Sequence, residues 1–267
     1  MNIAPLIQEY KNLNLHDVIN YDRFNEFAIT HHSTAIEGST LSLQDVQLLL
    51  NDGLTPAGKP FIHALMVKNH FDAIRFVMDL PNDTVINIPL IQKMNALVMK
   101  DTGVTYNTAL GTVNSSEGEF RKGNVTAGDS YFPNYDKVPQ LMNRLVENLE
   151  KELVVANTIN EKIELSFKAH FDLVSIHPFY DGNGRTSRLL MSLIQKRFGL
   201  PLAIVFIEDK KEYINALVAS RKNENLRPFF NFMYSQYAKF LNAEIEKYKS
   251  EIQDKNKDVR GGFSLVF

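Results

Sequence analysis

The sequence contains no cysteine among its 267 residues, which excludes a disulfide framework, a thiolate zinc site and a cysteine nucleophile. No run of apolar residues is as long as a membrane-spanning helix, which needs about 18 residues. The N-terminus lacks the basic flank and apolar stretch of a signal peptide. The sequence has 29 Lys and Arg residues and 31 Asp and Glu residues. This charge balance does not favour binding to nucleic acid. We therefore expect a cytoplasmic protein with no nucleic-acid partner and no membrane partner.

The composition is that of a folded globular protein, with 44% hydrophobic and 22% charged residues. At about 150 residues per domain, the length allows one large or two small domains. Apolar residues recur at helical spacing in several segments, and proline or glycine ends two of them. These segments are 61–77, 141–153, 163–174, 189–194 and 229–240. The patterns predict an all-α fold.

The segment from Gly103 to Pro133 differs from the rest, because it combines several glycines with Thr and Val and has few periodic apolar positions. Glycine breaks helices, and Thr and Val favour extended chain. We therefore predict a short β-hairpin over Glu119 to Gly128 on an otherwise helical body.

Two glycine-rich stretches resemble phosphate-binding loops without satisfying their patterns. Residues 53–60 match a P-loop up to the last position, where Pro60 replaces the magnesium-binding hydroxyl residue. We interpret this stretch as a turn between helices. Residues 182–187 lack the third glycine of a dinucleotide-binding turn and follow no strand pattern, so we exclude a Rossmann turn.

The second stretch nevertheless lies in a corner that is suited to bind an anion. An apolar helix ends just before His177, which Pro178 is expected to bias toward extended backbone. Gly182 and Gly184 permit positive φ and leave backbone N–H groups accessible. A new helix starts near Arg185, so loop amides and the positive end of a helix face one cavity.

The side chains of this corner suit phosphate chemistry. Arg185 and Arg188 are three residues apart, on one helical face, where two guanidinium groups can bind a polyphosphate. Asp181 offers a hard oxygen to Mg²⁺, and His177 is the side chain suited to general-base catalysis near neutral pH. The alternative is a capped helix–turn–helix with solvated charges. It does not explain why a histidine, a carboxylate and two arginines converge on one loop.

The segment from His177 to Arg188 resembles the signature of the Fic (Fic/Doc) domain family, H-P-F-x-[D/E]-G-N-G-R-x-x-R. All nine fixed positions are present: His177, Pro178, Phe179, Asp181, Gly182, Asn183, Gly184, Arg185 and Arg188. The resemblance implies a Fic-type helical bundle with a short β-hairpin flap beside the active site. It also implies three regions: an N-terminal helical region (1–80) with an inhibitory helix at about 30–50, a catalytic core (81–235), and a C-terminal helix and tail (236–267).

The resemblance further implies a protein adenylyltransferase, which moves AMP from ATP to a Ser, Thr or Tyr hydroxyl of a target protein or of itself. His177 would deprotonate the hydroxyl, and Asp181 would hold Mg²⁺ together with the phosphates. Arg185 and Arg188 would neutralise the outer phosphates. The other implied phosphate-binding residues are Gly182, Asn183, Gly184, Thr186 and Ser187. The implied partners are ATP and an unidentified target protein.

Two upstream segments extend the resemblance. Ser33, Glu37 and Gly38 match the [S/T]-x-x-x-E-[G/N] inhibitory motif, which implies that Glu37 pairs with Arg188 and keeps the resting enzyme weakly active. The alternative is an ordinary helix turn with an exposed Glu. Residues 120–128 resemble the family's flap, where a target docks by strand addition. The residues implied to cover the nucleotide are Val125, Thr126, Ala127 and Gly128.

The adenine end is the least defined part of the resemblance. Residues 213–217 resemble the segment that lines the base pocket, which implies contacts from Tyr213 and Ile214. The spacing downstream departs from the family, and Asn223 is the residue that we place in the pocket there.

Three other functions stay open. The first is transfer of UMP, phosphocholine or phosphate, because the signature specifies the phosphates more than the base. The second is removal of AMP from a modified target, with Glu37 activating water. The third is a nucleotide-binding interaction protein silenced by Glu37, although an intact His177 and Asp181 argue against it.

Overall fold

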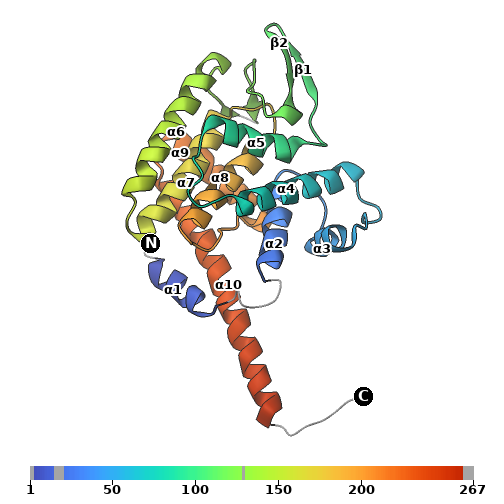
Figure 1. The fold of residues 1–267 in the computed structure, drawn as a ribbon, viewed down its shortest axis with the longest axis vertical. Coiled ribbons are helices and arrows are strands. Elements are labelled where there is room, and N and C mark those ends of the chain that lie inside the picture. Colours follow the sequence, from blue (N-terminus) through green and yellow to red (C-terminus); the bar gives the residue numbers. More distant parts are fainter. Residues whose placement is uncertain (1–2, 15–20, 128–129, 261–267) are drawn as a thin grey trace.

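The computed structural model describes residues 3–14, 21–127 and 130–260. In these ranges ten α-helices surround one core, and two antiparallel hairpins lie at one end (Figure 1). The helices are α1 (Ala4–Asn12), α2 (Tyr21–Ile36), α3 (Leu43–Asp52), α4 (Phe61–Asp79), α5 (Ile88–Met99), α6 (Val138–Val155), α7 (Ile159–Ile176), α8 (Asn183–Arg197), α9 (Lys210–Lys222) and α10 (Arg227–Arg260). The hairpins are β1 (Thr105–Thr108) with β2 (Gly111–Asn114), and β3 (Thr126–Ala127) with β4 (Ser130–Tyr131). The predicted all-α fold is confirmed.

The segments with helical periodicity fold as α4, α6, α7, α8 and α10, so the pattern located these helices correctly. Residues 53–60 are a turn as predicted, because Gly53 ends α3 with a φ of +71° and α4 begins at Phe61. The predicted inhibitory helix at 30–50 is instead two helices. α2 ends at Ile36, and Ser42 starts α3 with a capping box formed with Asp45.

The extended stretch holds both hairpins, but of their four strands only β3 lies within the predicted range of Glu119 to Gly128. Residues 119–125 form no strand, and the second hairpin begins at Thr126. Gly128, at the end of the predicted hairpin, lies outside the described residues. The first hairpin, β1 with β2, precedes the predicted range.

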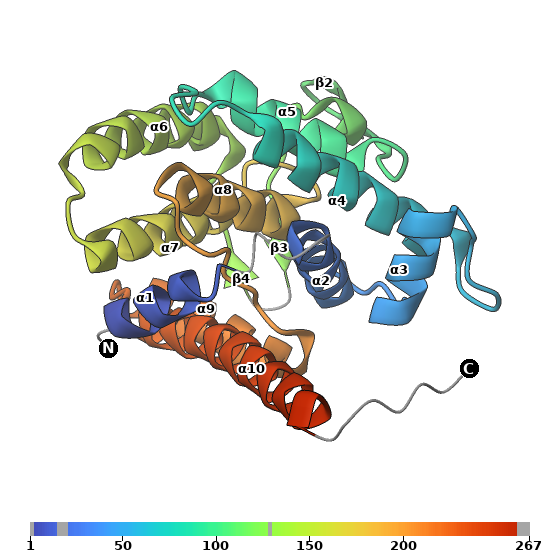
Figure 2. The same ribbon diagram turned by 60° about the horizontal axis from the view of Figure 1, so that its bottom comes forward.

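α8 is the central helix of the bundle, with α4 and α5 on one side and α7 and α2 around the rest (Figure 2). Every residue from Asn183 to Gln195 except Gly184 is buried. Polar side chains in this helix are therefore paired inside the protein. Gln195, for example, donates to Ser166 Oγ at 3.1 Å and accepts from the Ala203 amide at 2.8 Å.

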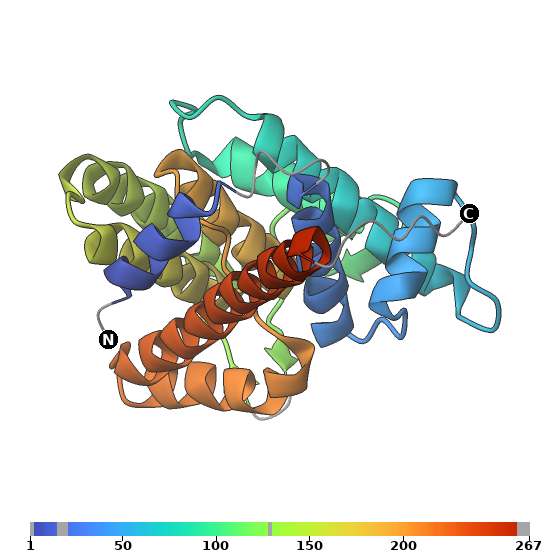
Figure 3. The ribbon, with the colours of Figure 1, turned by 90° about the horizontal axis from the view of Figure 1, so that it is seen from below.

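α9 and α10 pack side by side, α10 also contacts α7, and α1 packs against α10 (Figure 3). One hydrophobic cluster runs from Ile3 to Ile245 and draws residues from all three regions predicted from the sequence. No helix in the described ranges is both long enough and apolar enough to span a lipid bilayer.

Two histidines are completely buried against α8, His70 from α4 and His170 from α7. Burial lowers the pKa of both well below the ordinary value of 6.5, and the charge of Arg188 adds to the effect. Both side chains therefore stay neutral in the folded state, whereas they take up protons below pH 6.5 in the unfolded chain. Their contribution to stability is present above pH 6.5 and is lost as the pH falls below it.

We therefore expect the free energy of unfolding to fall between pH 7.5 and 5.5 by about 1 kcal/mol for each of these two histidines. Urea unfolding at both pH values measures the difference. The single variants His70→Asn and His170→Asn should each lose their own share of the pH dependence. A pH dependence that both variants keep in full contradicts the assignment.

Candidate active site

The loop from His177 to Gly182 connects α7 to α8 and changes the chain direction through two left-handed residues. His177 ends α7 with φ +53° and ψ +58°, and its amide donates to Leu173 O at 3.0 Å. Gly182 precedes α8 with φ +77°. The expectation of extended backbone at His177 is therefore wrong. Pro178 disfavours the right-handed helical region for the residue before it, and the helix cap takes the left-handed region instead.

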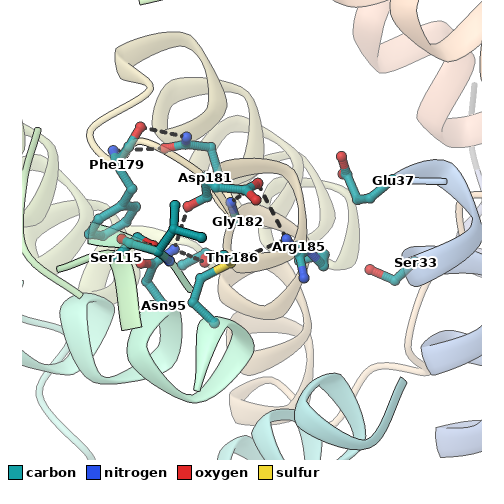
Figure 4. Close-up of polar contacts among 12 residues, drawn as sticks. Ser33, Glu37, Asn95, Ser115, Phe179, Asp181, Gly182, Arg185 and Thr186 are labelled. Carbon is teal, nitrogen blue, oxygen red and sulfur yellow. Dashed lines mark hydrogen bonds and ion pairs between the residues drawn. The ribbon is translucent and has the colours of Figure 1, made fainter. Parts of the chain in front are cut away.

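Amide side chains, rather than a ligand, hold the shape of this loop. Asn183 accepts from the Phe179 amide at 3.0 Å and donates to the Phe179 carbonyl at 2.9 Å. Asn95 of α5 donates to Asp181 O at 3.0 Å and to Thr186 Oγ1 at 3.1 Å (Figure 4). The side chain of Asn183 is thus used within the loop, so this residue can offer a phosphate only its backbone amide.

Two of the predicted phosphate-binding residues face the protein interior. Thr186 and Ser187 are both completely buried. Thr186 is held by Asn95, and Ser187 donates to Gly184 O at 2.9 Å. Their side chains cannot contact a phosphate in this arrangement. The open part of the helix start is Gly184, which is half-buried, with the free N–H groups of the first helical turn around it.

Arg185 brings a buried positive charge to the start of α8. Its side chain is 2% exposed, and Nη2 contacts Asp181 Oδ1 at 3.3 Å. Nε and Nη1 have no hydrogen-bond partner among the described residues. Unsatisfied donors on a buried guanidinium are costly, so an anion bound at this corner would stabilise them.

Arg188 links α8 to the end of α2. Its Nε donates to Ser33 Oγ at 2.8 Å, and its Nη2 donates to Ser33 O at 2.9 Å and to Glu37 Oε1 at 2.8 Å. Burial would raise the pKa of Glu37, but the charges of Arg188 and Arg185 outweigh it and hold this pKa below its ordinary value. Glu37 is therefore ionised at neutral pH. Gly38 follows it in a turn with φ +106°.

The carboxylate of Glu37 also lies against the backbone of Gly184. A Cβ atom on Gly184 would collide with Glu37 Oε1. Figure 4 shows Glu37 and Ser33 approaching the start of α8 from the side opposite Asn95. The space in front of the helix start is thus occupied by a carboxylate of this same chain.

The imidazole of His177 is held by one hydrogen bond and one aromatic ring. Nδ1 lies 3.3 Å from Val174 O, and the ring stacks on Phe132 with centroids 3.9 Å apart and planes 18° apart. The pKa of His177 is lowered to about 4, chiefly by burial; the charges of Arg121 and Arg221 contribute to the lowering, whereas Val174 and Glu37 oppose it. His177 is therefore neutral, and because Nδ1 donates to Val174, Nε2 carries the free lone pair.

The segment before β3 is anchored to this loop by Arg121, whose side chain is 2% exposed. Arg121 Nε donates to His177 O at 2.8 Å, and its backbone amide donates to Pro178 O at 2.9 Å. Its other nitrogens donate to Gly123 O and Pro133 O. The hairpin that follows exposes Thr126 and Ala127, with Val125 half-buried; Gly128 lies outside the described residues.

The predicted adenine-binding residues do not lie together. Tyr213 is buried, and its hydroxyl lies 2.8 Å from His170 Nε2. It therefore belongs to the core and not to an open pocket. Ile214 and Asn223 are exposed on α9 and at its end. The end of α9 reaches the flap, because Arg221 donates to Ser130 Oγ at 3.2 Å.

Sequence reasoning missed three residues of the site: Asn95, Arg121 and Phe132. The sequence pattern could have indicated a role for Asn95, because it is a polar residue on the buried face of an apolar helix, between Met94 and Val98. No sequence pattern could have indicated Arg121 or Phe132, since a buried arginine and a stacked phenylalanine look the same in a sequence as exposed ones.

The helical body, the glycine corner before a buried central helix and the adjacent hairpin define a Fic-type fold. The structure of Fic-1 from C. elegans has a TM-score of 0.74 and 26% identity, covering 95% of this chain and 72% of that one. A Fic-domain signalling protein from Bacteroides thetaiotaomicron has a TM-score of 0.78 at 22% identity, covering 94% of this chain and 97% of that one. The second likeness concerns the fold alone.

The sequence comparisons agree. Residues 85–195 match the model of the Fic/DOC family. Curated proteins named Protein adenylyltransferase Fic from Drosophila willistoni and Nematostella vectensis are 32% and 31% identical over 208 residues, or 78% of this chain. The aligned part covers 39% and 46% of those two proteins. The chain therefore carries a Fic/DOC-family domain and spans less than half the length of these relatives.

Proposed function

We propose that this chain is a protein adenylyltransferase, which transfers AMP from ATP to a hydroxyl group of a protein. The observation that carries the proposal is the position of a neutral imidazole, His177, beside a helix start that has buried arginines and free amides. The relatives named Protein adenylyltransferase Fic support the choice of nucleotide and reaction.

In the proposed reaction, Nε2 of His177 takes the proton of the target hydroxyl as its oxygen attacks the α-phosphorus. A new P–O bond forms, the bond to the bridging oxygen breaks, and pyrophosphate leaves with the electron pair. Arg185 and Arg188 neutralise the outer phosphates, and the amides around Gly184 stabilise charge on the α-phosphate. Positioning and electrostatics therefore supply the catalysis, and no covalent intermediate on the protein is required.

Asp181 fits a role as a magnesium ligand. Its side chain is 56% exposed, and Oδ1 alone contacts Arg185 and the Gly182 amide. One carboxylate is enough when phosphates provide the other ligands, and no group of three or more His, Cys, Asp or Glu in the described ranges forms a metal site by itself. Asp181 would hold Mg²⁺ with the phosphates, and the ion would supply further neutralisation of their charge.

Glu37 supports a regulatory role in this proposal. It occupies Arg188 with a charge-assisted bond of 2.8 Å and lies against Gly184. ATP phosphates need the same guanidinium and the same space. In the resting protein Glu37 therefore keeps transfer slow.

The flap supports docking of the target. Thr126 and Ala127 of β3 and Tyr131 of β4 are exposed, so this hairpin offers a strand edge for an extended target segment. Hydroxyl residues on the same hairpin, such as Thr126 and Ser130, make modification of the chain by itself part of the proposal. The proposed cytoplasmic location is testable by cell fractionation.

Intact-mass analysis of the Glu37→Gly variant, incubated with Mg²⁺ and one nucleotide at a time, tests the reaction type and the donor. We expect one added AMP mass with ATP and none with UTP or CTP. His177→Ala is the control that should stay unlabelled. An adduct with UTP alone, or the same ATP adduct on His177→Ala, refutes the proposed function.

A further inference from the structure

No carboxylate of the described residues makes a hydrogen bond to the imidazole of His177, although a carboxylate often orients a catalytic histidine. Among the described residues its Nδ1 contacts only a carbonyl oxygen, Val174 O, at the long distance of 3.3 Å. A single weak bond leaves the ring free to rotate about its side-chain torsions. The other close contact is the face-to-face stack with Phe132 at 3.9 Å.

Arginines bind the residues that precede and follow Phe132 in the sequence. Two residues before it, Ser130 Oγ accepts from Arg221 at 3.2 Å, and the guanidinium carbon of Arg221 lies 5.6 Å from the Phe132 ring centroid. One residue after it, Pro133 O accepts from Arg121 at 2.5 Å. A half-buried aromatic ring next to two such anchors has a defined position.

Arg121 connects the backbone beside Phe132 with the backbone of His177. The same guanidinium donates to Pro133 O, next to Phe132, and to His177 O at 2.8 Å. The backbone that carries the phenyl ring and the backbone that carries the imidazole are thus tied to one planar group. His177 needs such support, because its left-handed φ of +53° is unfavourable for a residue with a side chain.

We propose that Phe132 is a positioning residue, whose ring fixes the plane of the His177 imidazole and excludes water from one face of it. The proposal rests on the function proposed above, in which His177 is the general base. It also makes β4 and the residues after it part of the catalytic machinery, since a shift of residues 130–133 moves the contact that orients the base.

The electrostatic surroundings of His177 agree with this role. Burial is the main cause that lowers the pKa of His177, to about 4. The charged groups near the ring are Arg121 before β3, Arg221 on α9 and Glu37 after α2. Removing the phenyl ring leaves these three charges in place and lets water reach the imidazole.

The test is an NMR titration of the His177 imidazole in the nucleotide-free protein, with its signal assigned from its loss in His177→Asn. Phe132→Ala should raise the pKa of His177 from about 4 toward 6.5, whereas Phe132→Tyr, which keeps a ring, should not. Tyr131→Ala is the matched control, because Tyr131 is 83% exposed on the same hairpin. It should leave the titration unchanged.

Activity provides the second measurement. Phe132→Ala should lower kcat about 10- to 100-fold with a smaller change in KM, and Phe132→Tyr should restore most of it. An unchanged His177 titration in Phe132→Ala, or a shifted titration with unchanged kcat, overturns the positioning role. A titration that shifts as expected while no variant transfers any nucleotide refutes the proposed function instead, so the two failures are distinguishable.

Discussion

Replacing His177 by alanine is expected to lower the rate of AMP transfer by about 10²- to 10⁴-fold, the usual contribution of a general base. His177 is neutral and has a free ring nitrogen, whereas the nearby carboxylates of Asp181 and Glu37 are ion-paired with Arg185 and Arg188. Single-turnover labelling with saturating ATP and Mg²⁺ measures the chemical step directly.

The left-handed backbone at His177 calls for a second variant. Asparagine tolerates this conformation better than most residues, so His177→Asn removes the base with less strain at the end of α7. Both variants should still bind ATP in calorimetry, because in the proposed reaction the phosphates contact Arg185, Arg188 and amides of α8. Transfer by His177→Asn within tenfold of the wild-type rate excludes His177 as the base.

Replacing Glu37 by glycine is expected to raise the rate of AMP transfer about 10- to 100-fold. A hydrogen bond between charged groups contributes about 1.5–3 kcal/mol, which corresponds to this range. The substitution releases Nη2 of Arg188 and opens the space in front of Gly184. Initial rates of labelled AMP incorporation into the chain, compared at equal ATP concentration, measure the effect.

Glu37→Gln separates charge from volume. The amide keeps the size of the side chain and an oxygen that can accept from Arg188, but it loses the negative charge. Since Oε1 also lies against Gly184, we expect an activity between those of the wild-type protein and Glu37→Gly. Equal rates in all three proteins would mean that Glu37 does not restrain the reaction.

The sequence located the corner of the site because its chemistry is local. Two glycines, an aspartate and two arginines within twelve residues predict an anion site wherever the surrounding helices pack. The pairing of Glu37 with Arg188 is not local, and only the family resemblance linked these two residues across 151 positions; the structure places them 2.8 Å apart.

The directions of the side chains could not be predicted in the same way. Thr186 and Ser187 look like phosphate ligands at a helix start, but α8 is the centre of the bundle, so neighbouring helices cover them. Tyr213 was placed in a nucleotide pocket and is buried beside His170. The stack of Phe132 on His177 joins residues 45 positions apart whose types fit any apolar contact. Such contacts are decided by long-range packing.

Ser33 and Glu37 are one helical turn apart, and both hold the same guanidinium on α8. If ATP takes Arg188, then ATP binding and the seating of α2 oppose one another, and thermodynamic linkage makes this opposition reciprocal. A ligand or protein that moves α2 away from Arg188 raises the affinity for ATP. ATP raises the affinity for that ligand by the same factor. Binding of another molecule to the N-terminal helices can thus regulate ATP binding through Arg188.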